Sequence, residues 1–189
     1  IGMMLHGGVV AAMGTFFVFS DYMKPAVRIA ALMQVPVKFI WTHDAFRVGE
    51  DGPTHEPVEQ EAQIRLMEKL KNHAGKDSVR VFRPADADET TVCWKLAMEN
   101  VDTPTALIFS RQGIAKLPEG TDYEQAAKGA YIVAGSDENP DVILVASGSE
   151  VSTLEAGCEA LRADGIKVRV VSAPSEGLFR GQSKEYQES

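Results

Sequence analysis

The sequence predicts an α/β fold in which a mainly parallel sheet is flanked by helices on both faces. Short β-branched runs alternate with longer stretches of helical period, and this alternation is typical of strand–helix–strand units. Apart from Lys38, Arg80 and Arg169, the predicted strands are apolar rather than alternating, as expected of strands that helices cover on both faces. The strands are expected over residues 37–41, 79–82, 105–109, 142–146 and 168–171, with 9–13 as a further candidate.

The first 19 residues contain no Lys, Arg, Asp or Glu, and an apolar stretch of this length raises the question of a membrane-spanning helix. Four glycines and His6 interrupt the stretch, and no basic segment precedes it as a secretory signal would require. The chain begins at Ile1, inside this apolar segment and without a helix cap. We therefore expect it to be a fragment of a longer protein.

Four stretches of helical period have recognisable ends. Pro36 follows the first stretch, and Pro57 opens the second. Asp86 or Asp88 can cap the start of the third, and Gly165 closes the fourth. The helices are therefore expected over residues 19–33, 58–70, 88–98 and 151–164.

The chain of 189 residues is long enough for one domain or two small ones. A polar stretch that contains Pro118 and Gly120 separates the first group of elements from a strand-like segment that starts at Tyr131. The last region has two clear strands, too few to close a sheet, so we expect it to be truncated as well. The expected organisation is a first domain over residues 1–112, a linker over 113–130 and part of a second α/β domain over 131–189.

Composition excludes several classes of protein. The chain has 27 Asp and Glu against 19 Lys and Arg, a formal net charge of -8, and its basic residues form no cluster. Nucleic acids and membrane surfaces are therefore not expected as partners. The two cysteines, Cys93 and Cys158, lie inside apolar helical patterns. They indicate a reducing compartment, with the cytoplasm as the default.

Polar side chains follow the predicted strands, at the sheet edge where ligands bind in open parallel sheets. The densest group is His43, Glu50, Asp51 and His55. Two imidazoles and a carboxylate can bind hydroxyl groups and shuttle protons on a small polar substrate, and they can also ligate zinc. The loop lacks the HExxH and CxxC spacings of strong zinc sites, so no metal site is predicted. A solvated loop that caps a helix is the structural alternative.

Two further features each allow a functional and a structural interpretation. Arg111, at a strand exit, can hold a phosphate or carboxylate with two N–H donors, or it can form a surface ion pair. Phe16, Phe19 and Tyr22 recur every three residues, which predicts side chains on one helical face. Such a stripe is usually part of the core, and the alternative is a flat platform for a heteroaromatic ring.

Seven characteristic segments extend over essentially the whole chain. They are LHGG (5–8), GTFFVFSDYMKPAVRIAALM (14–33), THD (42–44), GEDGPTHEPVEQ (49–60), RPAD (83–86), PTALIFSRQ (104–112) and DVILVASGSEV (141–151). Together they resemble the transketolase family, and GEDGPTH followed by PVEQ is highly specific. Deoxyxylulose phosphate synthases and dehydrogenase E1 components, which are related thiamine enzymes, share the fold but not this set of segments.

The resemblance implies a thiamine diphosphate-binding fold, with residues 1–112 as most of the pyrimidine-binding domain. It also implies the reversible transfer of a two-carbon ketol (glycolaldehyde) unit from a ketose phosphate to an aldose phosphate, through a thiamine diphosphate adduct. In the family pattern, the aromatic side chains of the second segment form the pocket for the aminopyrimidine ring. This pattern assigns Phe16, Phe19 and Tyr22 to cofactor binding.

The same resemblance assigns contacts to the sugar phosphate substrates. The family's histidine in THD and arginine in SRQ hold the phosphate, which assigns His43 and Arg111. The aspartate and second histidine of GEDGPTH contact the ketose hydroxyls near the reacting carbons, which assigns Asp51 and His55. A site built to hydrogen-bond hydroxyl groups rejects substrates that lack them. His55 and His43 are the implied catalytic residues.

The resemblance places essential parts of the active site outside this sequence. Family members are homodimers in which the cofactor lies between the pyrimidine-binding domain of one subunit and the diphosphate-binding domain of the other. A glutamate that contacts the pyrimidine is expected before Ile1, and Mg²⁺ or Ca²⁺ is expected in the parent enzyme with ligands outside this chain. The fragment alone is therefore expected to be inactive. The alternatives are a catalytically silent assembly or binding module of the same fold and another thiamine enzyme, such as a deoxyxylulose phosphate synthase.

Two regions depart from the family pattern. Residues 45–48 read Ala-Phe-Arg-Val where the family commonly has Ser-Ile-Gly-Leu, and Arg47 either adds positive charge near the phosphate or points to solvent. Residues 68–78 are longer and more charged than expected before the RPAD segment. We interpret them as an added surface loop, and they include none of the residues assigned above.

Overall fold

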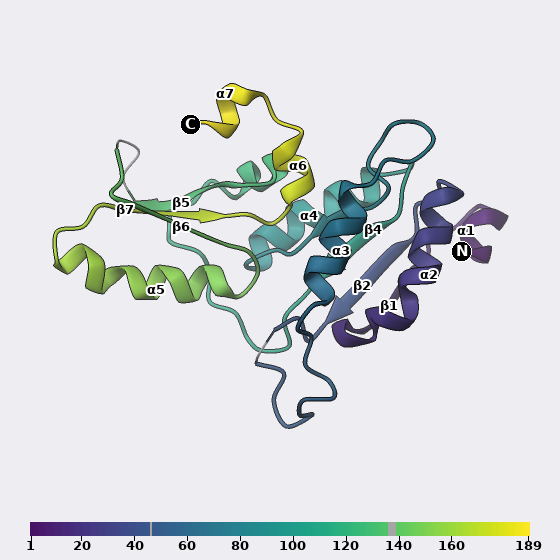
Figure 1. The fold of residues 1–189 in the computed structure, drawn as a ribbon, viewed down its shortest axis with the longest axis horizontal. Coiled ribbons are helices and arrows are strands. Elements are labelled where there is room, and N and C mark those ends of the chain that lie inside the picture. The colour runs from purple at the N-terminus through teal and green to yellow at the C-terminus, as the bar shows by residue number, and fades with distance from the viewer. Residues whose placement is uncertain (46, 136–138) are drawn as a thin grey trace. The chain divides into compact units, whose positions relative to one another are not determined.

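The computed structural model describes residues 1–45, 47–135 and 139–189 (Figure 1). The chain divides into two compact units, and helix α4 (Ala87–Glu99) contributes to both because one division falls between residues 94 and 95. The expected domain boundaries at residues 112 and 131 stay a prediction. Unit 1 consists of Ile1–Phe82 and Lys95–Gly113, and unit 2 consists of Arg83–Trp94 and Ile114–Ser189.

Unit 1 is built on a parallel four-stranded sheet with the strand order β1-β2-β4-β3. Parallel neighbours need crossover connections, and α2 (Ser20–Leu32), α3 (Gln60–Lys69) and α4 supply them. The predicted mainly parallel sheet is therefore confirmed. Its strands are β1 (Ala12–Phe16), β2 (Lys38–Thr42), β3 (Arg80–Phe82) and β4 (Thr105–Ile108).

One face of this sheet carries the core of unit 1. Phe39 and Trp41 of β2 point to the same face because side chains alternate along a strand, and both are fully buried. They belong to one apolar cluster with Val27 of α2 and Ile64 of α3, so these two helices cover this face. Burying a side chain of this size stabilises the fold by about 1.5–3 kcal/mol.

The opposite face carries a polar row. Lys38, Thr105 and Arg80 occupy equivalent positions on β2, β4 and β3, because Thr105 is in register with both of the others. The Lys38 Nζ donates to the carbonyl oxygen of Asn100, directly after α4, at 2.8 Å. The end of α4 therefore lies on this face, which confirms the prediction of helices on both faces of the sheet.

The start of the chain forms short elements, α1 (Gly2–His6) and η1 (Phe17–Phe19). No helix in the described part of the chain has the length and apolar character needed to cross a bilayer. The prediction of a strand over residues 9–13 is wrong by three residues. Pairing decides the position of β1, because its ladder with β2 runs from Ala12 opposite Lys38 to Phe16 opposite Thr42.

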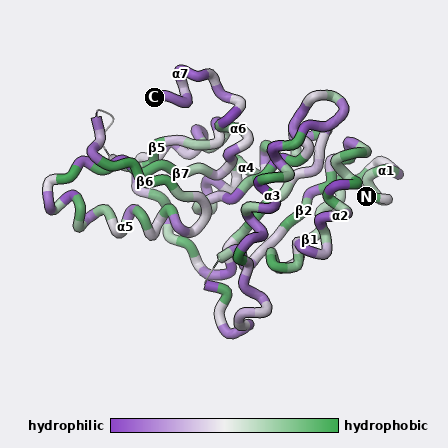
Figure 2. Tube along the Cα trace, in the orientation of Figure 1, coloured by the Kyte–Doolittle hydropathy of each residue, from purple (hydrophilic) through white to green (hydrophobic). Residues whose placement is uncertain are grey.

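Unit 2 contains a three-stranded sheet with the order β5-β7-β6. β6 (Val142–Ala146) and β7 (Val168–Ser172) are parallel and are joined by α5 (Glu150–Ala163). The strand-like segment at Tyr131 forms a third strand, β5 (Tyr131–Gly135), which is antiparallel to β7. Figure 2 shows hydrophobic residues along β6 and much of β7. The remaining elements are η2 (Tyr123–Lys128), α6 (Glu176–Arg180) and α7 (Lys184–Gln187).

Two carboxylates organise the part of α4 that belongs to unit 2. The Asp86 Oδ1 accepts the backbone N–H of Glu89 at 2.9 Å, which is the predicted helix cap, and its Oδ2 accepts the N–H of Leu117 at 3.1 Å. The fully buried Glu89 accepts the N–H of Ala85 at 2.7 Å and the hydroxyl of Tyr131 at 2.8 Å. Burial raises the pKa of the Glu89 carboxyl above its usual range.

Candidate functional site

The carboxyl ends of β1, β2 and β4 lie next to one another, because these are neighbouring strands of the parallel sheet (Figure 1). Phe16 ends β1, His43 follows β2, and Arg111 follows β4. The ladder continues beyond β4, since the N–H of Phe109 donates to the carbonyl oxygen of Trp41 at 2.7 Å. Side chains that are far apart in the sequence therefore emerge at one edge of the sheet.

Three aromatic side chains form a continuous row at this edge. The ring centroids of Phe16 and Phe19 are 6.1 Å apart with an interplanar angle of 15°, and those of Phe19 and Tyr22 are 6.2 Å apart. The prediction of one helical face is wrong, because Phe16 ends β1, Phe19 lies in η1 and Tyr22 lies in α2. Tyr22 is 82% exposed and the phenylalanines are partly exposed. The row is therefore an open aromatic surface rather than part of the core.

His43 packs directly against this row. Its φ of 62° lies in the left-handed region, which is uncommon for a residue other than glycine, so the chain turns sharply after β2. The imidazole stacks on the Phe16 ring with a centroid separation of 3.7 Å and an interplanar angle of 20°. The Nδ1 is 2.9 Å from the Thr42 Oγ1. The other ring nitrogen, Nε2, has no hydrogen-bond partner among the described residues, so it can bind a ligand.

His55 meets the same row from the loop between β2 and α3. Its ring lies edge-on to Phe19 with a centroid separation of 5.4 Å, and to Phe16 at 5.9 Å. Its Nδ1 is 2.9 Å from the Thr54 Oγ1, and its backbone N–H closes a turn with the carbonyl oxygen of Gly52 at 3.0 Å. Both predicted histidines therefore border one aromatic surface.

Arg111 lies against the same loop. A Cβ atom at Gly49 would be 3.2 Å from the guanidinium carbon, so the glycine allows a close approach of the side chain to the loop backbone. Beside it, the Ser110 Oγ and the Gln112 Nε2 are buried without a hydrogen-bond partner in the described part of the chain. Buried polar atoms are usually paired, so a polar ligand at this strand end would satisfy them. No role was predicted from the sequence for Ser110 or Gln112, and their place on either side of Arg111 at a strand exit was the available signal.

The structure does not join Asp51 to this group. Asp51 is exposed in the loop between β2 and α3, and it forms no hydrogen bond or ion pair with any described residue. Within residues 1–45, 47–135 and 139–189, no three His, Cys, Asp or Glu side chains are arranged to hold a metal ion. The geometry therefore joins the aromatic residues and the imidazoles, whereas Asp51 makes no polar contact with them.

Comparison with known proteins covers both parts of the chain. Residues 1–116 match the family described as "Transketolase, pyrimidine binding domain", and residues 129–189 match "Transketolase-like TK C-terminal domain". The chain belongs to the transketolase family. The transketolase of Halalkalibacterium halodurans is 51% identical over 189 residues, which cover 99% of this chain and 27% of that relative. The chain thus spans about a quarter of the length of the curated transketolases it matches.

Solved transketolases share this fold. The transketolase from Leishmania mexicana matches with a TM-score of 0.87 and 38% identity, covering 99% of this chain and 26% of that one. A Pichia stipitis transketolase in complex with sedoheptulose-7-phosphate matches with a TM-score of 0.82 and 41% identity, covering 93% and 24%. A split gene transketolase, described as an inactive β4 tetramer, matches with a TM-score of 0.71 and 26% identity, covering 92% of this chain and 52% of that one. The aromatic row and both imidazoles lie inside the matched pyrimidine-binding domain.

Proposed function

We propose that this chain supplies the pyrimidine-binding half of a transketolase active site. The complete enzyme would reversibly transfer a two-carbon ketol unit from a ketose phosphate to an aldose phosphate. The observation that carries the proposal is the row of Phe16, Phe19 and Tyr22 bordered by His43 and His55. It combines a flat surface for a heteroaromatic ring with groups that bind hydroxyls. Membership of the transketolase family supports the same activity.

Thiamine diphosphate fits the aromatic row. Phe16, Phe19 and Tyr22 would hold its pyrimidine ring, because heteroaromatic rings stack on partly exposed aromatic faces and these rings are accessible. When bound, the cofactor supplies the carbon nucleophile and the electron sink for breaking a carbon–carbon bond. We assign the accompanying Mg²⁺ or Ca²⁺ to the part of the enzyme beyond this sequence.

His43 and Arg111 would hold the phosphate of the sugar substrate. Arg111 can place two parallel N–H donors on one phosphate, and charge-assisted bonds of this kind are stronger than neutral ones. The unpaired Ser110 Oγ and Gln112 Nε2 would add further polar contacts at the same strand end. The Pichia stipitis transketolase in complex with sedoheptulose-7-phosphate supports sugar phosphates as the substrate class.

His55 and Asp51 would contact the ketose hydroxyls near the reacting carbons. The Nδ1 of His55 lies beside the Thr54 hydroxyl, so its Nε2 is available to bind a hydroxyl or exchange a proton with it. His43 has the same arrangement with Thr42. Asp51 is exposed and has to approach the substrate from the loop. The histidines are therefore the proposed catalytic residues.

We further propose that the parent enzyme is a cytoplasmic homodimer with the cofactor at the subunit interface, and that it serves the pentose phosphate pathway. In this view residues 1–112 form the pyrimidine-binding domain, 113–130 the linker and 131–189 the first part of the C-terminal domain. The chain alone would be inactive because it offers half of the cofactor site. The split gene transketolase described as an inactive β4 tetramer supports this expectation, since this chain matches 52% of it.

Complementation tests the proposal. The chain is mixed with a separately produced N-terminal part of the Halalkalibacterium halodurans transketolase, thiamine diphosphate, Mg²⁺ and a pair of sugar phosphates. That part runs through the diphosphate-binding domain up to the residue that aligns just before Ile1, so it also supplies the expected glutamate. We expect ketol transfer in the mixture and none above the blank with either part alone. Phe16→Ala in this chain should abolish the activity of the mixture, whereas Tyr123→Ala, an exposed aromatic in unit 2, should not.

Two results would contradict the proposal. Ketol transfer by the isolated chain would show that it is more than half of a site, and full activity with Phe16→Ala would remove the aromatic row from the cofactor site. If sedimentation shows that the two parts associate while the mixture remains inactive, the chain is a silent assembly module instead.

A further inference from the structure

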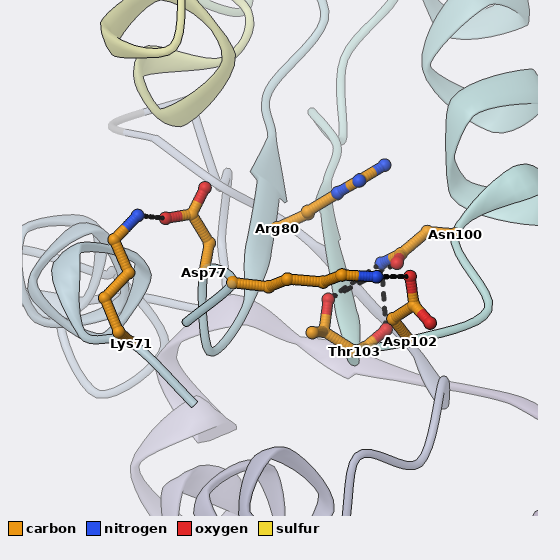
Figure 3. A pocket seen from close by; sticks show the side chains of 7 residues that line it. Lys71, Asp77, Arg80, Asn100, Asp102 and Thr103 are labelled. Carbon is orange, nitrogen blue, oxygen red and sulfur yellow. Dashed lines mark hydrogen bonds and ion pairs between the residues drawn. The ribbon is translucent and has the colours of Figure 1, made fainter. Parts of the chain in front are cut away.

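A polar pocket with a volume of about 320 Å³ lies within unit 1, away from the aromatic row (Figure 3). Its walls come from the loop between α3 and β3, the first residue of β3 and the connection between α4 and β4. The charged and amide side chains that line it are Lys71, Lys76, Asp77, Arg80, Asn100 and Asp102.

This pocket and the aromatic row lie at opposite edges of the sheet. Arg80 begins β3 and Asn100 precedes β4, whereas Phe16 ends β1 and Arg111 follows β4. A strand of five residues spans roughly 16 Å, so the two places are distinct. A role of this pocket is therefore independent of the function proposed for the aromatic row.

Arg80 is a cation of this pocket whose side chain has no polar partner among the described residues. Its side chain is partly buried, and its guanidinium forms no hydrogen bond or ion pair with the described residues. Figure 3 shows it between Asp77 and Asn100, with no dashed line to either. A guanidinium keeps its charge and offers five N–H donors. A partly buried group of this kind is stabilised by an anion that accepts those donors.

The two carboxylates of the pocket are already paired with lysines. The Lys71 Nζ is 2.5 Å from the Asp77 Oδ1, and Lys76 is paired with Asp102. The lysine side chains are 62% and 54% exposed. Exposed ion pairs contribute little to stability, so these lysines can turn toward a ligand at little cost.

A buried lysine adds positive charge behind the pocket wall. Lys38 is 2% exposed, lies in the same row of the sheet as Arg80, and is held by the Asn100 carbonyl oxygen. The Asn100 side-chain amide donates to the hydroxyls of Thr103 and Thr105 at 3.1 and 2.9 Å. Arg80 in the wall and Lys38 buried behind it are therefore two cations that contact neutral groups or none among the described residues.

Hydrogen bonds within the charged loop between α3 and β3 hold it in a defined shape. The N–H of Ser78 donates to the carbonyl oxygen of Leu70 at 2.8 Å, and the Asn72 Oδ1 accepts the N–H groups of Ala74 and Lys76. Figure 2 shows this loop as a hydrophilic segment. The prediction of a surface loop over residues 68–78 is wrong at its start, because Glu68 and Lys69 belong to α3 and Glu68 is buried. The residues after α3 form the loop and contribute Lys71 and Lys76 to the pocket.

We propose that this pocket binds a phosphate group, with Arg80 as the main contact and Lys71 and Lys76 as outer contacts. Arginine pairs with phosphate through two parallel N–H donors, and lysine acts as a point charge. The lining has three cationic side chains against two anionic ones, in a chain with a net charge of -8. The lining thus has an excess of one positive charge, Lys38 behind the wall adds a second, and a phosphate dianion balances the two.

Calorimetric titration of the full chain with inorganic phosphate, at constant ionic strength, tests this proposal. Arg80→Gln should weaken binding by about tenfold or more, the size expected for a lost charge-assisted contact. Asp102→Asn releases Lys76 and should tighten binding several-fold. Opposite effects from the two variants cannot come from general damage to the fold. A phosphate monoester is titrated in parallel, and tighter binding than that of the free ion would identify a phosphorylated metabolite as the ligand.

Two matched arginine variants locate the binding. Arg28→Gln removes an exposed arginine of α2 and should leave the affinity unchanged, and Arg111→Gln changes the strand end at the other edge. The proposal is overturned if Arg80→Gln binds phosphate as the parent does, or if Arg111→Gln alone removes all binding. Circular dichroism checks that each variant folds. If Arg80→Gln does not fold, an unchanged affinity of Asp102→Asn overturns the proposal instead.

Discussion

We expect the stability of the parent protein to rise at alkaline pH, and replacing Lys38 with Met should remove that rise. Lys38 is almost fully buried, and its Nζ donates to the Asn100 carbonyl oxygen at 2.8 Å. Burial, together with the smaller effect of the nearby Arg80 charge, lowers the pKa of this amine from 10.5 to about 8. Met has a similar length and no charge, so it keeps most of the packing while removing the titration.

The size of the effect follows from the two pKa values of Lys38. In the unfolded chain the amine titrates at its ordinary value of 10.5, and in the folded protein at about 8. Below pH 8 both states hold the proton, so the cost of burying the charge is fully present. Between pH 8 and 10.5 the unfolded state holds the proton that the folded state has lost, so the free energy of unfolding rises with pH. The difference corresponds to about 3 kcal/mol.

Urea unfolding followed by Trp41 fluorescence measures this effect, with Trp94→Phe as the background so that the signal comes from unit 1. The free energy of unfolding of the parent minus that of Lys38→Met should increase by about 3 kcal/mol between pH 7 and pH 10.5. At pH 7, Lys38→Met has two opposing effects on the free energy of unfolding. Removing the buried charge raises it, and losing the hydrogen bond to Asn100 lowers it by about 1–3 kcal/mol. Lys95→Met, at an exposed lysine of α4, is the control. Parallel pH curves for the parent and Lys38→Met would refute the reasoning.

Two further predictions concern the candidate site and the fold. In the complemented enzyme, His43→Ala should raise KM about tenfold or more for phosphorylated ketose donors and leave unphosphorylated donors nearly unchanged; steady-state kinetics with both donor types checks this, and equal effects would exclude a phosphate contact. Asp86→Ala should lower the free energy of unfolding by about 1–2 kcal/mol, because the N–H groups of Glu89 and Leu117 lose their acceptor. Thermal unfolding measures the loss, and Asp86→Asn, which keeps a side-chain oxygen, should lose less.

The local sequence pattern was sufficient to predict the elements whose position depends on their own amino acids. β2 and β4 follow from apolar β-branched runs, and the Asp86 cap follows from a carboxylate directly before a helical stretch. β1 could not be placed in the same way, because an edge strand is positioned by its partner and Ala12 has to lie opposite Lys38. Local apolar character alone favoured a position three residues earlier.

The sequence placed the aromatic residues together for the wrong reason. Phe16, Phe19 and Tyr22 meet because β1 continues through η1 into α2, not because they share a helical face. The proposed phosphate pocket could not be predicted from the sequence, and the reason is different. Lys38 and Arg80 were visible as charged exceptions in apolar strands, but their adjacency depends on the strand order β2-β4-β3, which local periodicity does not contain.

The strand order of unit 1 also constrains how the chain assembles as it is made. β2 can pair with β1 as soon as residues 38–42 are synthesised, whereas β3 has its ladder with β4, which comes later in the chain and inserts between β2 and β3. Parallel pairings between distant segments form slowly. During translation the backbone groups of β3 therefore stay unpaired until β4 has been made, and an exposed strand edge of this kind favours mispairing in that interval.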